Sequence, residues 1–189
     1  MNRKILYFIN PVSGAKRKPL LKDAIEERML SEEIPFEIAL TTPDGEYPGL
    51  ADKVKKEGIT DVVICGGDGT VNQVTSGLLD ASVNIGIIPC GSGNGLALAA
   101  KIPRNIQRAL QIVLTGNPTS IDSFFINEKF SCMLCGVGFD AQVAHDFALQ
   151  PKRGLMTYVE QSVKNFITAK PYPFDITCGG KTFLPMLIL

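Results

Sequence analysis

The stretch VVICGGDGTVNQV, residues 62–74, decides the fold of this chain. It begins with a continuous apolar run, Val62 to Cys65, which is typical of a strand buried on both faces of a parallel sheet. Gly66, Gly67 and Gly69 follow at once and strip most Cβ atoms from the turn. Backbone N–H groups in such a turn can face a ligand directly.

Phosphate is the ligand that this turn suits best. A helix is expected to follow over residues 71–79, with Thr70 as its cap, and the partial positive charge at its N-terminus favours an anion. Asp68 is itself an anion in the same turn. An acid beside phosphates makes sense if Mg²⁺ lies between them, or if the acid takes a proton from an attacking hydroxyl. The turn therefore favours phosphoryl transfer over passive binding.

The surrounding sequence alternates short apolar runs with helical patterns. Strands are expected over residues 4–9, 36–40, 62–65 and 84–88, and helices over 17–29, 50–56, 71–79, 96–100 and 106–114. Four βα units in series predict an α/β fold, with a parallel sheet covered by helices on both faces. We assign residues 1–118 to this domain and expect its ligand at the carboxyl ends of the strands.

Two more turns are expected at the same edge of the sheet. NPVSG, residues 10–14, ends the first strand, and PCGSGNG, residues 89–95, ends the fourth. One glycine-rich turn is often only a tight connection, but a single nucleotide can touch three turns at one edge. The familiar phosphate fingerprints do not fit: the GKT at 180–182 lacks the Walker glycine, and Asn72 replaces the third glycine of GxGxxG.

The pattern changes near residue 119, where strands come back to back. IDSFFIN and KFSCMLCGV, residues 121–127 and 129–137, meet at Asn127 and Glu128, which is a hairpin signal. Helices are expected over 141–148 and 155–167, followed by two strand-like runs around CGGKT. Two short hairpins make a poor independent core. We therefore expect residues 119–189 to begin a β-rich second domain, in a chain that is a fragment or whose partner strands come from elsewhere.

The composition limits the partners and the compartment. The 189 residues are 45% hydrophobic and 20% charged, with 19 basic and 19 acidic side chains, so no nucleic-acid partner is expected. No window is long enough to span a bilayer and the N-terminus lacks a signal-peptide core, which predicts a cytoplasmic protein without a transmembrane segment. The cysteines are expected to be buried reduced thiols, with Cys132 and Cys135 on opposite faces of a strand.

Four motifs together resemble the diacylglycerol kinase catalytic-domain family of lipid kinases, which includes bacterial diacylglycerol kinases and sphingosine kinases. They are NPVSG (10–14), GGDGTVNQV (66–74), IPCGSGNGLAL (88–98) and GVGFDAQV (136–143), in the family's order. GGDGT alone is shared with NAD kinases and phosphofructokinases. The resemblance implies an α/β nucleotide-binding domain, a β-rich domain and an active site between them. It also implies transfer of the γ-phosphate of ATP, with Mg²⁺, to a lipid hydroxyl such as that of diacylglycerol or a sphingoid base.

The resemblance also assigns roles to residues by position. Those implied to bind ATP are Asn10, Gly66, Gly67, Gly69, Thr70, Gly91, Ser92, Gly93 and Asn94. Asp68 would serve as the base or lie near Mg²⁺, directly or through water. Asp140, in the second module, would orient the acceptor.

The sequence departs from the family at two positions. Gln73 stands where members commonly have Glu, and Gly95 follows GSGN where many bacterial members read GTGND. The second departure is closer to the sphingosine kinase pattern and leaves the lipid open. The family's downstream acidic motifs are absent from this sequence. A non-catalytic nucleotide- or lipid-binding module therefore stays an alternative, as does, with less support, an enzyme similar to NAD kinases.

The partner implied is a lipid substrate, reached peripherally at a membrane surface. Lys152, Arg153, Lys164 and Lys170 can meet anionic headgroups there, although charged side chains are also ordinary surface residues. The oligomeric state is left open, and a homo-oligomer is one alternative.

Overall fold

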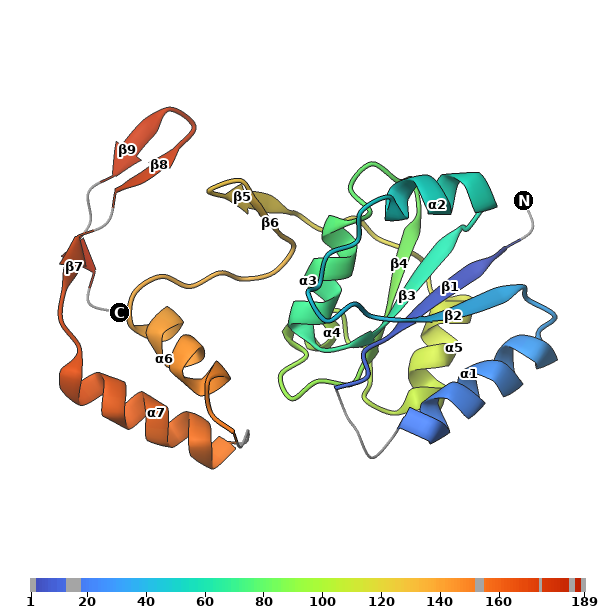
Figure 1. Cartoon of the computed structure of the whole chain (residues 1–189), viewed down its shortest axis with the longest axis horizontal. Coiled ribbons are helices and arrows are strands. Elements are labelled where there is room, and N and C mark those ends of the chain that lie inside the picture. Colours follow the sequence, from blue (N-terminus) through green and yellow to red (C-terminus); the bar gives the residue numbers. More distant parts are fainter. Residues whose placement is uncertain (1–2, 13–17, 152–154, 174, 184–185, 188–189) are drawn as a thin grey trace. The chain divides into compact units, whose positions relative to one another are not determined.

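The computed structural model describes residues 3–12, 18–151, 155–173, 175–183 and 186–187 (Figure 1). The chain forms two compact units, Met1–Met133 and Leu134–Leu189. The first unit contains a four-stranded parallel sheet and the helices that cover it. The second contains two helices and two pairs of very short strands.

The sheet of the first unit has the strand order β2-β1-β3-β4. Its strands are β1 (Ile5–Ile9), β2 (Phe36–Leu40), β3 (Asp61–Gly66) and β4 (Asn84–Pro89). All four run parallel, and the two central strands, β1 and β3, are buried along their whole length. Burial on both faces explains why the central strands are continuous apolar runs rather than alternating ones. The predicted parallel sheet is confirmed.

Helices cover both faces of this sheet, as the sequence predicts (Figure 1). They are α1 (Lys18–Ser31), α2 (Leu50–Glu57), α3 (Asp68–Ser76), α4 (Gly95–Ala99) and α5 (Ile106–Thr115). Alternate residues of β1 divide between the two layers, because successive side chains of a strand point to opposite faces. Ile5 and Tyr7 pack with α1 and α5, whereas Leu6 and Phe8 pack with α2 and α3.

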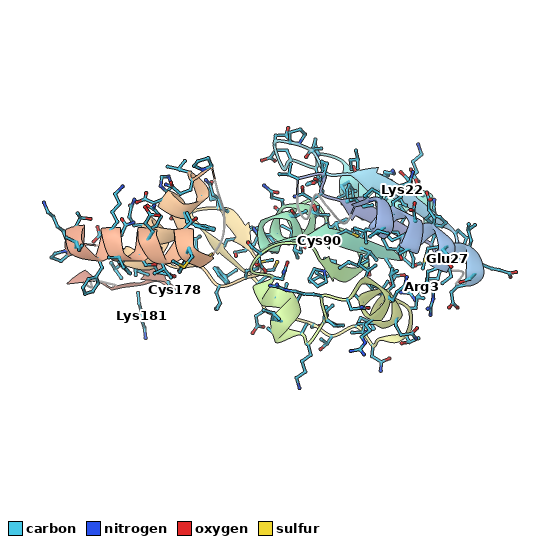
Figure 2. All side chains as sticks on the ribbon, turned by 90° about the horizontal axis from the view of Figure 1, so that it is seen from below. Arg3, Lys22, Glu27, Cys90, Cys178 and Lys181 are labelled. Atoms are coloured by element: carbon cyan, nitrogen blue, oxygen red, sulfur yellow. The ribbon has the colours of Figure 1, made fainter. Side chains whose placement is uncertain are left out.

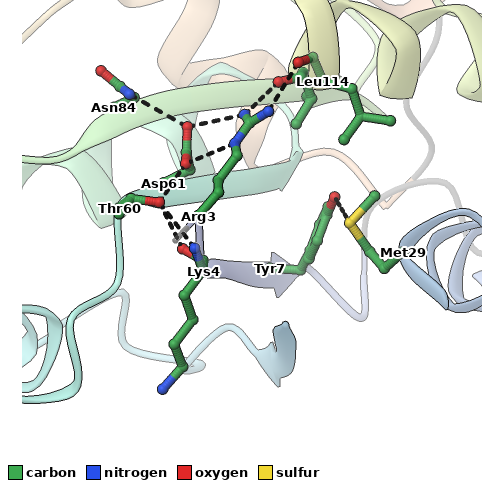
Figure 3. Close-up of polar contacts among 9 residues, drawn as sticks. Arg3, Lys4, Tyr7, Met29, Thr60, Asp61, Asn84 and Leu114 are labelled. Carbon is green, nitrogen blue, oxygen red and sulfur yellow. Dashed lines mark hydrogen bonds and ion pairs between the residues drawn. The ribbon is translucent and has the colours of Figure 1, made fainter. Parts of the chain in front are cut away.

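Helix α1 illustrates how the layers are held. Its inner side buries Leu21, Ile25 and Met29 in the core, while Lys22 and Glu27 on its outer side are exposed (Figure 2). Inside the layer, the fully buried hydroxyl of Tyr7 donates a hydrogen bond to Sδ of Met29 at 3.2 Å (Figure 3). Burial raises the pKa of Tyr7, so its phenol stays protonated and remains a donor.

The strand order places a topological switch between β1 and β3. These neighbours lead into α1 and α3, which pack on opposite faces of the sheet. In open α/β sheets, ligands bind outside the carboxyl ends of the strands at such a point. The fold therefore singles out the ends of β1 and β3 as the place to look for a site.

The predicted hairpin is present but shorter than expected. Strands β5 (Phe124–Ile126) and β6 (Lys129–Ser131) pair antiparallel, and Asn127 and Glu128 both have positive φ, at 46° and 65°. Two such residues make the turn whose twist matches a hairpin. The predicted strand over 129–137 is wrong beyond Ser131, because Ser131 pairs with Phe124, the first residue of β5, and the ladder ends there.

The second unit begins with α6 (Phe139–Ala148) and α7 (Leu155–Thr168). The two helices pack through edge-on aromatic pairs, such as Phe147 with Tyr158 at 5.7 Å between ring centroids. Strand β7 (Tyr172–Pro173) pairs with β10 (Met186–Leu187), and β8 (Ile176–Cys178) pairs with β9 (Lys181–Phe183). The C-terminal region thus contains the predicted β-structure, with strands of only two or three residues.

The predicted burial of the cysteines is only partly confirmed. Cys65 and Cys132 are buried, and burial raises the pKa of both thiols. Cys135 and Cys178 are exposed, so the expectation of buried thiols is wrong for them. Cys132 and Cys135 do not lie on one strand, because β6 has already ended at Ser131.

An ion pair ties together the amino ends of the strands, at the edge opposite the switch point (Figure 3). Nε and Nη2 of Arg3 each donate to a carboxylate oxygen of Asp61 at 3.0 Å, and Nη1 donates to the carbonyl of Leu114 in α5 at 2.9 Å. The Asp61 side chain is only 8% exposed. Burial alone would raise the pKa of Asp61, but hydrogen bonds from Arg3 and Thr60 outweigh it and hold the pKa below its usual range.

We predict that Asp61→Asn lowers the free energy of unfolding by about 2 kcal/mol at pH 7, because hydrogen bonds to charged groups are lost. The folded pKa lies below the unfolded value of roughly 3.9, so the contribution is complete above about pH 4 and is lost as the pH falls through the folded pKa. Urea unfolding from pH 7 to pH 2 measures it, with the exposed Asp80→Asn as control. A wild-type advantage that stays constant over this range would contradict the prediction.

Candidate functional site

Asn10 joins the end of β1 to α3 across the switch point. Its Nδ2 donates to Oγ1 of Thr70 at 2.7 Å, and its backbone N–H donates to the carbonyl of Cys65 at 3.0 Å. Its Oδ1 accepts from the N–H of Val12 at 2.8 Å, which shapes the turn that follows. Of the NPVSG motif, Ser13 and Gly14 lie outside the described residues.

The GGDGT segment is a direct junction of strand and helix rather than a loop. Strand β3 ends at Gly66, Gly67 is the N-cap, and α3 begins at Asp68, three residues earlier than predicted. The prediction that Thr70 caps the helix is therefore wrong: Thr70 lies buried in the first turn and bonds to Asn10. The first helical hydrogen bond runs from Val71 N–H to Gly67, so the preceding N–H groups have no such partner and attract anions.

The second glycine turn lies directly against the first. A Cβ atom placed on Gly91 would come within 2.6 Å of the Cα atom of Gly67, so the backbones touch where neither residue has a side chain. Asn94 shapes this turn from a left-handed conformation with φ of 61°, and its side chain is buried. Its Oδ1 accepts from the N–H of Gly91 at 2.8 Å, and its Nδ2 donates to the carbonyl of the same residue at 2.7 Å.

Asp68 links the two turns through its carboxylate. Its Oδ1 accepts from the N–H of Leu96, in the first turn of α4, at 3.2 Å. Its Oδ2 faces Gly93, where a Cβ atom would lie 3.1 Å away, and has no hydrogen-bond partner in the part of the chain that the structure describes. One oxygen of Asp68 thus holds the second turn, and the other is available to a cation or a proton.

Gly69 differs from the other glycines of the site. A Cβ atom on Gly66 would collide with the side chain of Thr70, and Gly67 contacts Gly91, so packing accounts for both. A Cβ atom on Gly69 would meet nothing within 4 Å. Glycine inside a helix costs about 1 kcal/mol relative to alanine, so packing gives no reason for it here. The reason that we infer for a glycine at this position is room for a ligand beside the first N–H groups of α3.

Three side chains near the site carry roles that sequence reasoning missed. Nη2 of the exposed Arg104 donates to the carbonyls of Ser92 and Gly93 at 2.7 and 3.2 Å, which fixes the second turn from outside. The Gln73 amide packs against Gly45, in the connection between β2 and α2. Asn72 bonds to the backbone near β6. Asn72 and Gln73 belong to the GGDGTVNQV motif, but the motif does not show these contacts, because each side chain acts on a segment distant in sequence.

The described residues offer little else for a metal ion. Among them, no three His, Cys, Asp or Glu side chains form a group that could hold a metal ion by themselves. Asp68 alone would supply a carboxylate. Mg²⁺ often binds through one or two carboxylates together with water and substrate phosphates, so a single acid in this position fits that ion.

The remaining predicted residues lie in the second unit. Asp140 is in the first turn of α6, where its Oδ2 would come within 2.8 Å of a Cβ atom on Gly136. Its role toward an acceptor stays a prediction. Lys164 and Lys170 are exposed, whereas Lys152 and Arg153 fall outside the described residues. In the ranges that the structure covers, every helix is too short or too polar to cross a membrane.

Comparison with known proteins places the chain among lipid kinases in sequence. The family model of the diacylglycerol kinase catalytic domain matches residues 4–126. "Probable lipid kinase YegS-like" from Citrobacter koseri is 30% identical over 166 residues, which are 84% of this chain and 54% of that protein. "Probable lipid kinase YegS" from Salmonella arizonae is 27% identical over 165 residues, again 84% and 54%. This chain thus spans about half the length of these relatives.

A solved structure shares the fold. The crystal structure of a diacylglycerol kinase from Bacillus anthracis superposes with a TM-score of 0.69 at 22% identity, over 97% of this chain and 61% of that one. The family match extends from the start of β1 to the end of β5 and includes both glycine turns and Asp68. From this match we conclude that the chain belongs to the diacylglycerol kinase catalytic-domain family.

Proposed function

We propose that this protein is a lipid kinase that transfers the γ-phosphoryl group of ATP to a lipid hydroxyl, such as that of diacylglycerol or a sphingoid base. The observation that carries the proposal is the open space at Gly69, in the first turn of α3, whose first N–H groups precede the first helical hydrogen bond. Asp68 supplies a carboxylate in the same turn. Packing does not explain this glycine. A phosphate next to the N-terminus of α3 would occupy the open space and would be attracted by the helix dipole.

In this proposal the backbone does most of the binding. The N–H groups of Asp68, Gly69 and Thr70 would hold the phosphates, and the turn of Gly91, Ser92 and Gly93 would line the nucleotide. Asn10 and Asn94 would act by fixing those turns, since their amides are already bonded to Thr70 and Gly91. A site with its donors fixed beforehand loses little free energy to rearrangement during phosphoryl transfer.

Asp68 would supply the acid that phosphoryl transfer needs. Mg²⁺, when bound, would neutralise negative charge on the phosphates. Oδ2 of Asp68 would hold that ion, directly or through water, or accept the proton of the attacking lipid hydroxyl. The bond from Leu96 N–H to Oδ1 supports either role, because it fixes the orientation of the carboxylate.

The rest of the proposal concerns the second domain. We place the domain limits at residues 1–118 and 119–189, following the change to back-to-back strands, so that the hairpin β5–β6 opens the second domain. Asp140 would orient the acceptor. The lipid would be reached peripherally from the cytoplasm at a membrane surface, where the exposed Lys164 and Lys170 would meet anionic headgroups.

A second candidate is a nucleotide-binding module without catalysis. It is favoured by Gln73, whose neutral amide packs on Gly45 at the position where family members commonly have a carboxylate. The two candidates differ in one measurement: both bind Mg-ATP in calorimetry, but only the kinase transfers labelled γ-phosphate to a lipid. The acceptor panel is diacylglycerol, sphingosine and ceramide in mixed micelles, with NAD as the soluble alternative.

We predict that Asp68→Asn reduces lipid phosphorylation at least about 100-fold, the scale of a lost acid or base group. The fold should persist, because Oδ1 of an asparagine can still accept from Leu96. Initial rates of label transfer, with circular dichroism as the check on folding, measure this, and the exposed Asp80→Asn is the matched control. Turnover near wild type in Asp68→Asn would rule out the assigned role.

We predict that Gly69→Ala stabilises the protein by roughly 0.5–1 kcal/mol, since alanine is the better helix former. The same methyl group should weaken Mg-ATP binding about tenfold, because it fills the space beside the phosphate-binding N–H groups. Thermal unfolding and calorimetry give the two values. Ser76→Ala, exposed at the far end of α3, is the control with unchanged affinity. Unchanged affinity in Gly69→Ala would mean that no phosphate lies there.

A further inference from the structure

The backbone after β6 is held by a side chain in place of a strand. Nδ2 of Asn72 donates to the carbonyl of Phe130 at 3.1 Å, and Oδ1 accepts from the N–H of Cys132 at 3.0 Å. A residue on a parallel strand bonds in the same way to a carbonyl and an N–H two residues apart. Asn72 therefore acts as one residue of an added strand at the outer edge of β6.

The segment that Asn72 holds, residues 130–132, packs against the first unit, and we call this arrangement the seated segment. Ser131 and Cys132 are each 7% exposed, and the thiol of Cys132 also donates to Oδ1 of Asn72 at 3.5 Å. Met133 packs against the core between the sheet and α3. The chain then leaves the first unit, which ends at Met133. The contact with Asn72 thus fixes the point at which the chain departs toward the second unit.

The same helix carries the proposed phosphate site. Asp68 and Asn72 are four residues apart on α3, so they lie on one side of the helix in successive turns. The first turn of α3 touches the second glycine turn, and the next turn holds residues 130–132. A ligand that shifts or steadies the start of α3 acts on a rigid element of nine residues, and Asn72 moves with it.

We propose that Asn72 is a positioning residue, which couples the phosphate-binding end of α3 to the segment that leads into the second unit. The proposal rests on the proposed function, because it takes the N-terminus of α3 to bind the phosphates of ATP. Asn72 touches no reacting atom and acts through the backbone of residues 130–132. Coupling requires that the nucleotide bind the seated and the released segment with different affinity.

Cys132 reports directly on whether this segment is seated. We expect iodoacetamide to label the buried Cys132 more slowly than the exposed Cys178, with fragment-ion masses separating Cys132 from Cys135. Saturating Mg-ATP should slow labelling of Cys132 by about threefold or more, because binding favours the seated segment. In Asn72→Ala, labelling of Cys132 should be about tenfold faster without nucleotide, because three hydrogen bonds are lost, one of them from the thiol itself. It should no longer respond to Mg-ATP.

Two further variants sharpen the test. Asn72→Asp keeps the shape and the acceptor for Cys132 N–H but cannot donate to Phe130, so it should also speed labelling. If circular dichroism shows that Asn72→Ala does not fold, Asn72→Asp replaces it as the test variant. Asn117→Ala, in an exposed loop, should match the wild type.

Each result is decisive. Labelling of Cys132 in Asn72→Ala and Asn72→Asp that is as slow as in the wild type would overturn the proposal. A wild-type protein that binds Mg-ATP by calorimetry with no change at Cys132 would also overturn it, because Asn72 would then be merely structural. Absence of Mg-ATP binding to the wild type would refute the proposed function and the coupling together. The labelling without nucleotide would still show whether Asn72 holds residues 130–132.

Discussion

The contact between Gly67 and Gly91 is the constraint on which the site depends. It brings two turns, 24 positions apart in sequence, to backbone contact at the carboxyl edge of the sheet. With the turns in contact, Asp68 reaches the first turn of α4 and accepts a hydrogen bond from Leu96. A side chain on either glycine would separate the turns and leave the carboxylate without its orienting donor. The absence of side chains at Gly67 and Gly91 is therefore as important for the site as the carboxylate of Asp68 and the N–H groups.

The opposite edge of the sheet is held by a different kind of interaction. There Arg3 joins β1, β3 and α5 through a largely buried ion pair. The carboxyl edge is held mainly by neutral amides and glycines, and Arg104 bonds to the second turn from outside. Such a division leaves Asp68 as the one carboxylate within the contacts that shape the turns. Among the described residues, no cationic side chain bonds to this carboxylate. That suits a carboxylate whose role is to bind a metal ion or accept a proton.

Sequence patterns predicted the parallel sheet, both helix layers, the glycine turns and the hairpin at Asn127, because these depend on local periodicity and turn chemistry. They failed where a distant contact decides. The Gly67 end of α3 packs on Gly91, and residues 130–132 are held by Asn72, 58 residues from Phe130. The sequence also could not distinguish Gly66 from Gly69. Packing requires a glycine at position 66 but not at position 69.

The bond pattern of Asn72 has a consequence for the behaviour of this protein in a crowded solution. A two-stranded hairpin normally leaves an open edge, which can recruit a strand from another molecule and start aggregation. At the outer edge of β6, the carbonyl of Phe130 and the N–H of Cys132 are already occupied. A single asparagine in a neighbouring helix thus shields that edge, beside the exposed and charged Lys129.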